Sequence, residues 1–223
     1  MKRLLLVIFC VVIATQFASC DSQKVSNSNA LLRSRYTVVI DAGHGGKDAG
    51  TIGVDGTAEK GINLSIALIL YDYLMVSGIN CKLVRDKDYE LYYTEEDKKK
   101  SDLYNRLDFV NSVENSALIS IHQNHFESEK EWGCQVWYSK NNPESKVFAD
   151  KILDSVKQFI QPDNSRENKE SSSAYYILYN AKVPSVMVEC GFMSNYNENK
   201  LLQDVNYQKK FAYAILAGIC GEV

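Results

Sequence analysis

Tyr36-Thr-Val-Val-Ile-Asp-Ala-Gly-His44-Gly-Gly-Lys-Asp-Ala-Gly50 is the stretch on which the prediction of the fold depends. Its β-branched run is bounded by glycine, which is typical of a buried strand that ends in a loop. Glycine lets a backbone turn tightly or approach a bound group closely, so His44 is expected to be presented at the end of a strand. An ordinary connection with an incidental histidine has the same pattern, and the rest of the sequence has to decide between the two.

Strand-like and helix-like segments alternate along the rest of the chain. Helical spacing predicts helices at about 57–77, 102–113, 143–160 and 207–219, the first with Thr57 as N-cap and Gly78 as its stop. Strands are expected at 36–41, 80–84, 117–122, 133–138, 174–179 and 184–189. The charged segment 85–101 is expected to be plain loop or a partner surface rather than a lid, and 161–173 to be polar loop. This alternation predicts a single α/β domain with a largely parallel, twisted central sheet of about six strands and helices on both faces.

The N-terminus has the features of an exported protein. Met1-Lys-Arg3 and the apolar run Leu4–Ala14 are typical of a secretory signal and short for a transmembrane span. Phe17-Ala-Ser-Cys20 resembles a bacterial lipobox, although Phe17 stands where a smaller aliphatic residue is usual. We therefore expect a signal peptide at 1–19, a Ser- and Asn-rich tether at 20–35 with Cys20 lipidated, and a folded domain at 36–223 outside the cytoplasmic membrane. Ordinary cleavage and an uncleaved anchor are the alternatives.

Length and composition suit one sizeable soluble domain, since the 223 residues are 45% hydrophobic and 24% charged. Without residues 1–19 the 25 basic side chains fall to 23, and against 28 acidic ones the net charge is −5. The basic side chains are not clustered densely enough in the sequence to predict a nucleic-acid-binding surface. The four cysteines of the mature chain have no CxxC spacing, which argues against a zinc ribbon and leaves their pairing open: Cys81, Cys134, Cys190 and Cys220.

Two histidines and one glutamate are candidates for a catalytic metal site. His44 and His122 directly follow apolar strand-like runs, and strand ends are where α/β sheets build ligand sites. Glu59 falls in the first turn of a predicted helix, where the helix dipole stabilises a carboxylate. Catalytic zinc usually takes three such ligands and leaves one position open for water. The three residues thus form a candidate His₂Glu set, although dispersed ligands are weak support by spacing alone.

His125 and Glu189 are two further candidates for the same site. His125 is a rival ligand; on a helix it would share a face with His122, whereas on an extended strand exit the two rings point to opposite sides. The preceding Leu-Ile-Ser-Ile favours the strand, so His125 is expected at the rim of the site or on the surface. Glu189 closes the apolar run 184–189. A carboxylate there either pairs with a cation in a structural salt bridge or serves as the general base and acid of a hydrolysis.

These residues lie in blocks that resemble the zinc-dependent N-acetylmuramoyl-L-alanine amidases of the amidase-3 type. The blocks are Ile40-Asp-Ala-Gly-His44-Gly-Gly with Asp48 and Gly50, Glu59-Lys60 with Asn63-Leu64, Arg106 with Asn111, Ser120-Ile-His122-Gln-Asn124, and Pro184, Val188-Glu189 and Gly191-Phe-Met-Ser-Asn195. They come in the family's order and cover nearly the whole mature domain. The resemblance implies that His44, Glu59 and His122 are zinc ligands and that Glu189 is the catalytic glutamate. Gln123 departs from the small residue usual between His and Asn, and is expected to alter the rim of the site without loss of a ligand.

The resemblance also implies an activity. The expected enzyme is a secreted, membrane-tethered hydrolase that cuts peptidoglycan between N-acetylmuramic acid and the L-alanine of the stem peptide, in cell wall or spore cortex. A bare catalytic domain behind a signal is similar to the spore-cortex branch, and an activating protein partner is a further expectation. Two alternatives are a zinc peptidase that cuts within the stem peptide and a lipoprotein that binds the wall without turnover. The presence of all four site residues argues against the second.

Overall fold

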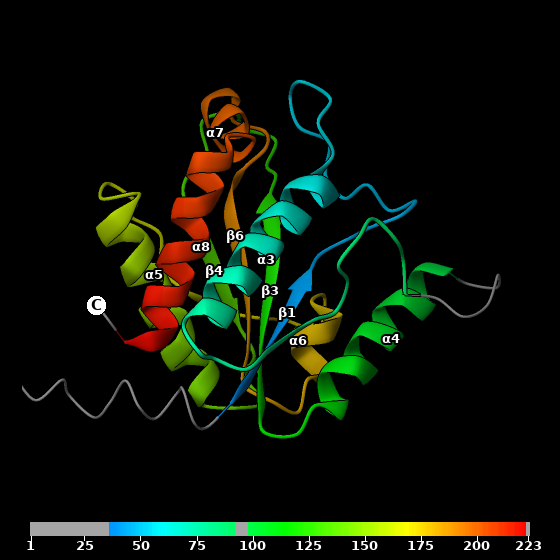
Figure 1. Ribbon diagram of the computed structural model, residues 1–223. Coiled ribbons are helices and arrows are strands. Elements are labelled where there is room, and N and C mark those ends of the chain that lie inside the picture. The colour runs from blue at the N-terminus through cyan, green and yellow to red at the C-terminus, as the bar shows by residue number, and fades with distance from the viewer. Residues whose placement is uncertain (1–35, 92–97, 222–223) are drawn as a thin grey trace, which may run out of the picture.

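The computed structural model describes residues 36–91 and 98–221. The expected signal peptide, Cys20 and the tether lie outside these residues. Within them, helices cover both faces of a central sheet (Figure 1), as the alternation of segments predicted. None of the helices in this part of the chain combines the length and the apolar character needed to cross a bilayer.

Six strands form the sheet in the order β2-β1-β3-β6-β4-β5. β4 runs antiparallel to β6, whereas the other neighbouring pairs are parallel. The strands are β1 (Thr37–Ala42), β2 (Cys81–Leu83), β3 (Ser116–Asn124), β4 (Gln135–Tyr138), β5 (Lys169–Glu170) and β6 (Ser185–Phe192). The expectation of about six largely parallel strands is therefore confirmed.

The central strands are apolar on both sides because helices pack on both faces of the sheet. Val38 and Ile40 of β1 belong to the larger core cluster, which they share with three helices: α3 (Glu59–Val76), α5 (Glu144–Phe159) and α8 (Val205–Cys220). Val39 faces the opposite side and packs in a smaller cluster with α4 (Lys98–Ser112) and α6 (Tyr176–Asn180). The carboxyl ends of the parallel strands β1 and β3 consequently lie side by side at one edge of the sheet.

The limits of α3 test two sequence predictions. The helix begins at Glu59, and its N-cap is Ala58, which makes no side-chain capping bond. The prediction of Thr57 as N-cap is therefore wrong; its hydroxyl instead donates to the side chain of Gln203 at 3.0 Å. Gly78 does end the helix as predicted, because its φ of +72° is a left-handed conformation that glycine adopts without strain.

The expected strand at 174–179 is wrong, since this segment contains helix α6. Its tyrosines and isoleucine have high strand propensity, but propensity yields to tertiary context. β6 already has β3 and β4 as its neighbours, so the sheet has no place for the segment beside β6. Ile177 and Leu178 are both buried, a pairing of successive residues that suits a helix packed on the sheet rather than a half-buried strand. The two-residue strand β5 lies in the expected polar loop, and its exposed side chains leave no apolar pattern to detect.

The short helix α7 (Tyr196–Leu202) was not expected either. The Asn195 side chain caps it by accepting bonds from the backbone N–H groups of Asn197 and Glu198. An asparagine followed three residues later by a glutamate is a recognisable start of a helix, so the signal was present in the sequence. The four cysteines among the described residues form no disulfide, and Cys134, Cys190 and Cys220 are buried, where cysteine behaves as a small apolar side chain.

Candidate metal centre

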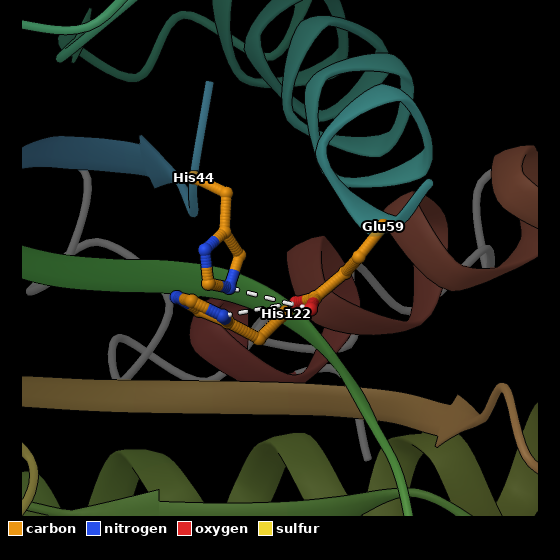
Figure 2. Close-up of side chains that lie close together, drawn as sticks. All are labelled: His44, Glu59 and His122. Carbon is orange, nitrogen blue, oxygen red and sulfur yellow. Dashed lines mark hydrogen bonds and ion pairs between the residues drawn. The ribbon is translucent and has the colours of Figure 1, made fainter. Parts of the chain in front are cut away.

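Three side chains from distant parts of the sequence meet at the carboxyl ends of β1 and β3. His44 lies two residues beyond β1, His122 belongs to β3, and Glu59 is the first residue of α3. Figure 2 shows the two rings and the carboxylate directed toward one another. His44 Nε2 lies 3.3 Å from Glu59 Oε2, and His122 Nδ1 lies 3.1 Å from Glu59 Oε1. One possible ligand atom of each residue lies within 4.8 Å of the other two, so the structure brings together the three candidates.

The cluster has a closed side and an open side. Glu59 is 2% exposed, whereas the side chains of His44 and His122 are 24% and 16% exposed. The loop backbone packs directly against these groups: a Cβ atom on Gly43 would lie 2.2 Å from the His122 ring, and one on Gly50 would lie 2.6 Å from Glu59 Oε2. Glycine is required at both positions for the observed packing, which explains why the strand gives way to a glycine-rich loop.

The charges in the cluster favour an ionised carboxylate. Burial by itself would raise the pKa of Glu59, but hydrogen bonds with His122 and His44 outweigh it and hold that pKa well below its usual range. Burial lowers the pKa of His44, but its contacts with Glu59 and Asp48 outweigh this and raise it overall. In the absence of a metal, the raised pKa of His44 favours its protonated form, which would place a positive charge beside Glu59. A divalent cation would supply the same charge between the same three groups.

Asp48 sets the orientation of the His44 ring. Its Oδ2 lies 2.9 Å from His44 Nδ1, and since an ionised carboxylate can only accept, Nδ1 carries the proton. The lone pair of the neutral ring is then on Nε2, the atom that faces Glu59. A carboxylate behind a metal-binding histidine commonly fixes the tautomer in this way. No role for Asp48 followed from residue patterns alone, although a carboxylate four residues after His44 in a tight loop was a usable signal.

Residues 85–90 hold the glycine-rich loop in place. The buried guanidinium of Arg85 donates to two backbone carbonyl oxygens at the end of β1 at 2.7 and 2.9 Å, and to one in the first turn of α3 at 2.9 Å. A fourth bond, at 3.0 Å, goes to the carbonyl oxygen of Lys87 in its own loop. Asp88 and Glu90 accept bonds from backbone N–H groups of the loop at 2.7 to 3.0 Å. The first part of the segment expected to be plain loop or a partner surface lies outside helices and strands, as a loop should, although its contacts tie it to the glycine-rich loop. The expectation is wrong for 98–101, which are helical. The middle of that segment, 92–97, lies outside the described residues, and the last part begins α4.

A second buried arginine joins α4 to the same loop. Arg106 forms ion pairs with Asp41 at 2.6 Å and with Asp102 at 2.7 Å. It also donates to the carbonyl oxygen of His44 at 2.7 Å. Asp41 accepts a further bond from Ser120 of β3 at 2.8 Å. The buried charges are thus paired, as they must be away from water, and their bonds tie three elements together beside the cluster.

Glu189 lies next to this cluster on β6. It is paired with His122 across β3 and β6, so the two side chains lie on the same face of the sheet. Glu189 is 9% exposed, and among the described residues its Oε2 has no hydrogen-bond partner and no cation forms an ion pair with it. Burial, and then the negative charge of Glu59, raise the pKa of Glu189 well above its usual value. The structural salt bridge considered from sequence is therefore not formed within the described part of the chain.

His125 and Gln123 are not among the three clustered side chains. His125 is exposed just beyond the end of β3 and is not part of the candidate metal-binding group, which agrees with the predicted extended exit from the strand. Gln123 was expected to alter the rim of the site, but its side chain does not lie there. Its side chain is buried and donates to Asn63 of α3. Alternation along a strand explains the difference, because the residue after His122 has to face the other way.

A cavity of about 90 Å³ lies against the open side, with His44, His122 and Arg106 in its wall. Sites for drug-sized ligands usually enclose roughly 300–1,000 Å³. A large substrate would therefore lie across the surface and place only its reacting group in this cavity. A cavity of about 420 Å³ between α7 and residues 160–163 has none of the three clustered side chains in its wall.

Comparison with known proteins places this site in a family. Residues 38–221 match the Amidase_3 family, described as N-acetylmuramoyl-L-alanine amidase. The germination-specific N-acetylmuramoyl-L-alanine amidase of Bacillus subtilis is 31% identical over 210 residues, which cover 92% of this chain and 85% of that protein. The amidase AmiA of Escherichia coli is 26% identical over 243 residues, which cover 88% of this chain and 81% of that protein.

Solved structures show the same relationship. The CwlD amidase from Clostridioides difficile, determined in complex with the GerS lipoprotein, has a TM-score of 0.79 and 39% identity over 82% of this chain and 96% of that one. The amidase AmiC2 of Nostoc punctiforme has a TM-score of 0.73 and 30% identity over 84% of this chain and 97% of that one. The matches span nearly all of the described domain and include its candidate metal centre. The chain therefore belongs to the amidase-3 family of N-acetylmuramoyl-L-alanine amidases.

Proposed function

We propose that this protein is a zinc-dependent peptidoglycan hydrolase that cleaves the amide bond between the lactyl group of N-acetylmuramic acid and L-alanine. The observation that carries the proposal is the meeting of His44, Glu59 and His122 beside the buried, unpaired carboxyl group of Glu189. Two imidazoles and one carboxylate form a donor set typical of catalytic zinc, and the partly exposed histidine side leaves room for a further ligand. Zinc bound there would polarise the scissile carbonyl group and lower the pKa of water toward about 7.

Glu189 would move the proton that amide hydrolysis requires. Its carboxylate accepts a proton from the attacking water as the new carbon–oxygen bond forms. It then delivers that proton to the amide nitrogen as the carbon–nitrogen bond breaks, so that the leaving group departs as an amine and not as an anion. Burial raises the pKa of Glu189, which favours the protonated form that has to donate in the second step. The products are the free lactyl carboxylate and a peptide that begins with L-alanine.

Product analysis separates this reaction from cleavage within the stem peptide. After digestion of purified sacculi, mass spectrometry should detect intact stem peptides with a new L-alanine amino terminus and glycan with free lactyl carboxylates. Zinc measured on the same preparation should be close to one ion per chain. Fragments cut between stem-peptide residues would show the peptidase instead, and a zinc-loaded protein that releases nothing would favour the wall-binding alternative. Parallel digests of vegetative sacculi and spore cortex show which of the two is the natural substrate.

We also propose that the mature protein is lipid-anchored at Cys20 on the outer side of the cytoplasmic membrane. The apolar segment that ends shortly before Cys20 and the polar tether after it support this proposal. A fatty-acid analogue supplied to cells should label the wild-type chain and leave Cys20→Ala unlabelled. Equal labelling of the two chains, or of neither, would leave ordinary secretion or an uncleaved anchor.

A protein partner is part of the same proposal. The CwlD amidase structure contains the GerS lipoprotein, and CwlD is similar to this chain over most of its length. By that likeness we infer that this chain also acts together with a protein partner at the cell envelope.

A further inference from the structure

The Gln123 side chain approaches the candidate metal centre from the face of the sheet that α3 covers. Gln123 follows His122 on β3, and its side chain points to that face. There its Nε2 donates to the side-chain oxygen of Asn63 at 3.0 Å. The side chain is 4% exposed, and among the described residues its own Oε1 has no hydrogen-bond partner. A buried amide with an unpaired oxygen is costly to stability, so a large stabilising role for this side chain is not expected.

Asn63 connects Gln123 to the carboxylate of Glu59. It lies one helical turn after Glu59 on α3 and is completely buried. Its amide nitrogen donates to Glu59 Oε1 at 3.0 Å and to the carbonyl oxygen of Gly43 at 3.2 Å. Both partners can only accept, so the amide cannot rotate by 180° without placing its oxygen against two other oxygens. The Asn63 oxygen therefore faces Gln123, which supplies the donor that it needs.

The two oxygens of Glu59 are held in different ways. Oε1 accepts the bond from Asn63 and another from the backbone N–H of Gln123 at 2.9 Å, and it faces His122. Oε2 accepts from the backbone N–H of Thr51 at 2.8 Å and faces His44. The side chains of Asn63 and Gln123 thus act on the Oε1 side of the carboxylate.

We propose that Gln123 and Asn63 are positioning residues, which orient the Glu59 carboxylate for metal binding through the chain of hydrogen bonds from Gln123 to Asn63 to Glu59. The inference rests on the proposed metal site and deepens it. Gln123 touches neither histidine ring through a hydrogen bond of its side chain, so its effect has to pass through Asn63. When a residue orients a metal ligand without binding the metal itself, its mutation typically lowers metal affinity by about 10–100-fold.

Gln123→Met tests the proposal, because methionine keeps the length and volume of the side chain but cannot donate. The dissociation constant of Zn²⁺ alone, measured by competition with a chelating indicator, should rise about 10–100-fold. The melting temperature of the metal-free protein should change little, since the variant removes one unpaired buried oxygen and leaves another on Asn63. Unchanged zinc affinity in Gln123→Met would overturn the inference while leaving the proposed metal site intact. A wild-type chain that fails to bind zinc would instead overturn the proposed site, and the inference with it.

Gln208→Met is the matched control. Gln208 is a similarly buried glutamine on α8, and its side chain bonds Ser65 at 2.5 Å and the carbonyl oxygen of Leu202 at 2.8 Å, away from the cluster. Its replacement should lower the melting temperature and leave zinc affinity unchanged. An equal loss of zinc affinity in both variants would show a general effect of losing a buried amide and would overturn the positioning role.

The double variant, with Asn63→Leu and Gln123→Met, tests whether Gln123 acts on Glu59 through Asn63. Asn63→Leu should itself weaken zinc binding, because it removes the bond to Glu59 Oε1. Adding Gln123→Met to Asn63→Leu should then weaken binding no further, since the two side chains act in series. A full additional loss in the double variant would mean that Gln123 acts by another path and would overturn the proposed chain of hydrogen bonds.

Discussion

Replacement of His44 or His122 by alanine is expected to remove bound zinc and hydrolytic activity together. The candidate site offers three protein ligands, and two cannot hold the ion with comparable affinity. The loss of activity should be complete at zinc concentrations that saturate the wild type. Zinc content and release of L-alanine amino termini should be measured on the same preparation, with melting temperature to show that each variant is folded.

His125→Ala is the control for this experiment. His125 is the remaining histidine of the chain, and it is exposed and lies outside the cluster. The variant should keep both zinc and activity. Loss of zinc from His125→Ala, or full zinc and normal turnover in His44→Ala, would show that the ligand set is assigned wrongly.

Replacement of Glu189 by glutamine is expected to lower turnover by about 10²–10⁴-fold, the usual contribution of a general acid–base group. Glutamine keeps the size of the side chain but cannot accept and return a proton. Zinc should remain bound, because the three proposed ligands are unchanged. Substrate affinity should change far less than turnover, since the missing interaction acts mainly in the transition state. An active, zinc-loaded Glu189→Gln protein would rule out the catalytic role.

The stability of the same variant gives an independent test. The folded-state pKa of Glu189 is raised above its ordinary value of 4.5, so between the two values folding takes up a proton. The contribution of Glu189 to the free energy of unfolding therefore falls as pH rises above the unfolded value. A glutamine side chain stays neutral, so the free energy of unfolding of the variant does not fall with rising pH for this reason. Metal-free Glu189→Gln should melt higher than the metal-free wild type at about pH 7, and the difference should shrink toward about pH 4. A lower melting temperature at neutral pH would point to a hidden structural partner of Glu189.

The main elements of the fold could be predicted because their signals are local. The β-branched run at 37–40 and the helical spacing after Glu59 reflect burial on the faces of one strand and one helix. The same local signals placed His44 and His122 at strand ends, where parallel strands bring their carboxyl ends together. The prediction failed where local preference and tertiary context differ. Tyr175 to Tyr179 have the composition of a strand, but the segment packs as helix α6 beside α4.

Local patterns in the chain were thus enough for the α/β class, the order of the main elements and the candidate residues His44, Glu59, His122 and Glu189. The contacts that hold these residues in place became visible only in the folded protein. Arg85 was counted as part of a surface loop, but it is buried and bonds the carbonyl oxygens that precede His44. Gln123 was expected to alter the rim of the site, but its side chain donates to Asn63 of α3. These contacts could not be predicted because hydrophobic periodicity indicates only which face of a helix or strand is buried. A hydrogen bond between residues 60 positions apart depends on the register and packing of whole elements.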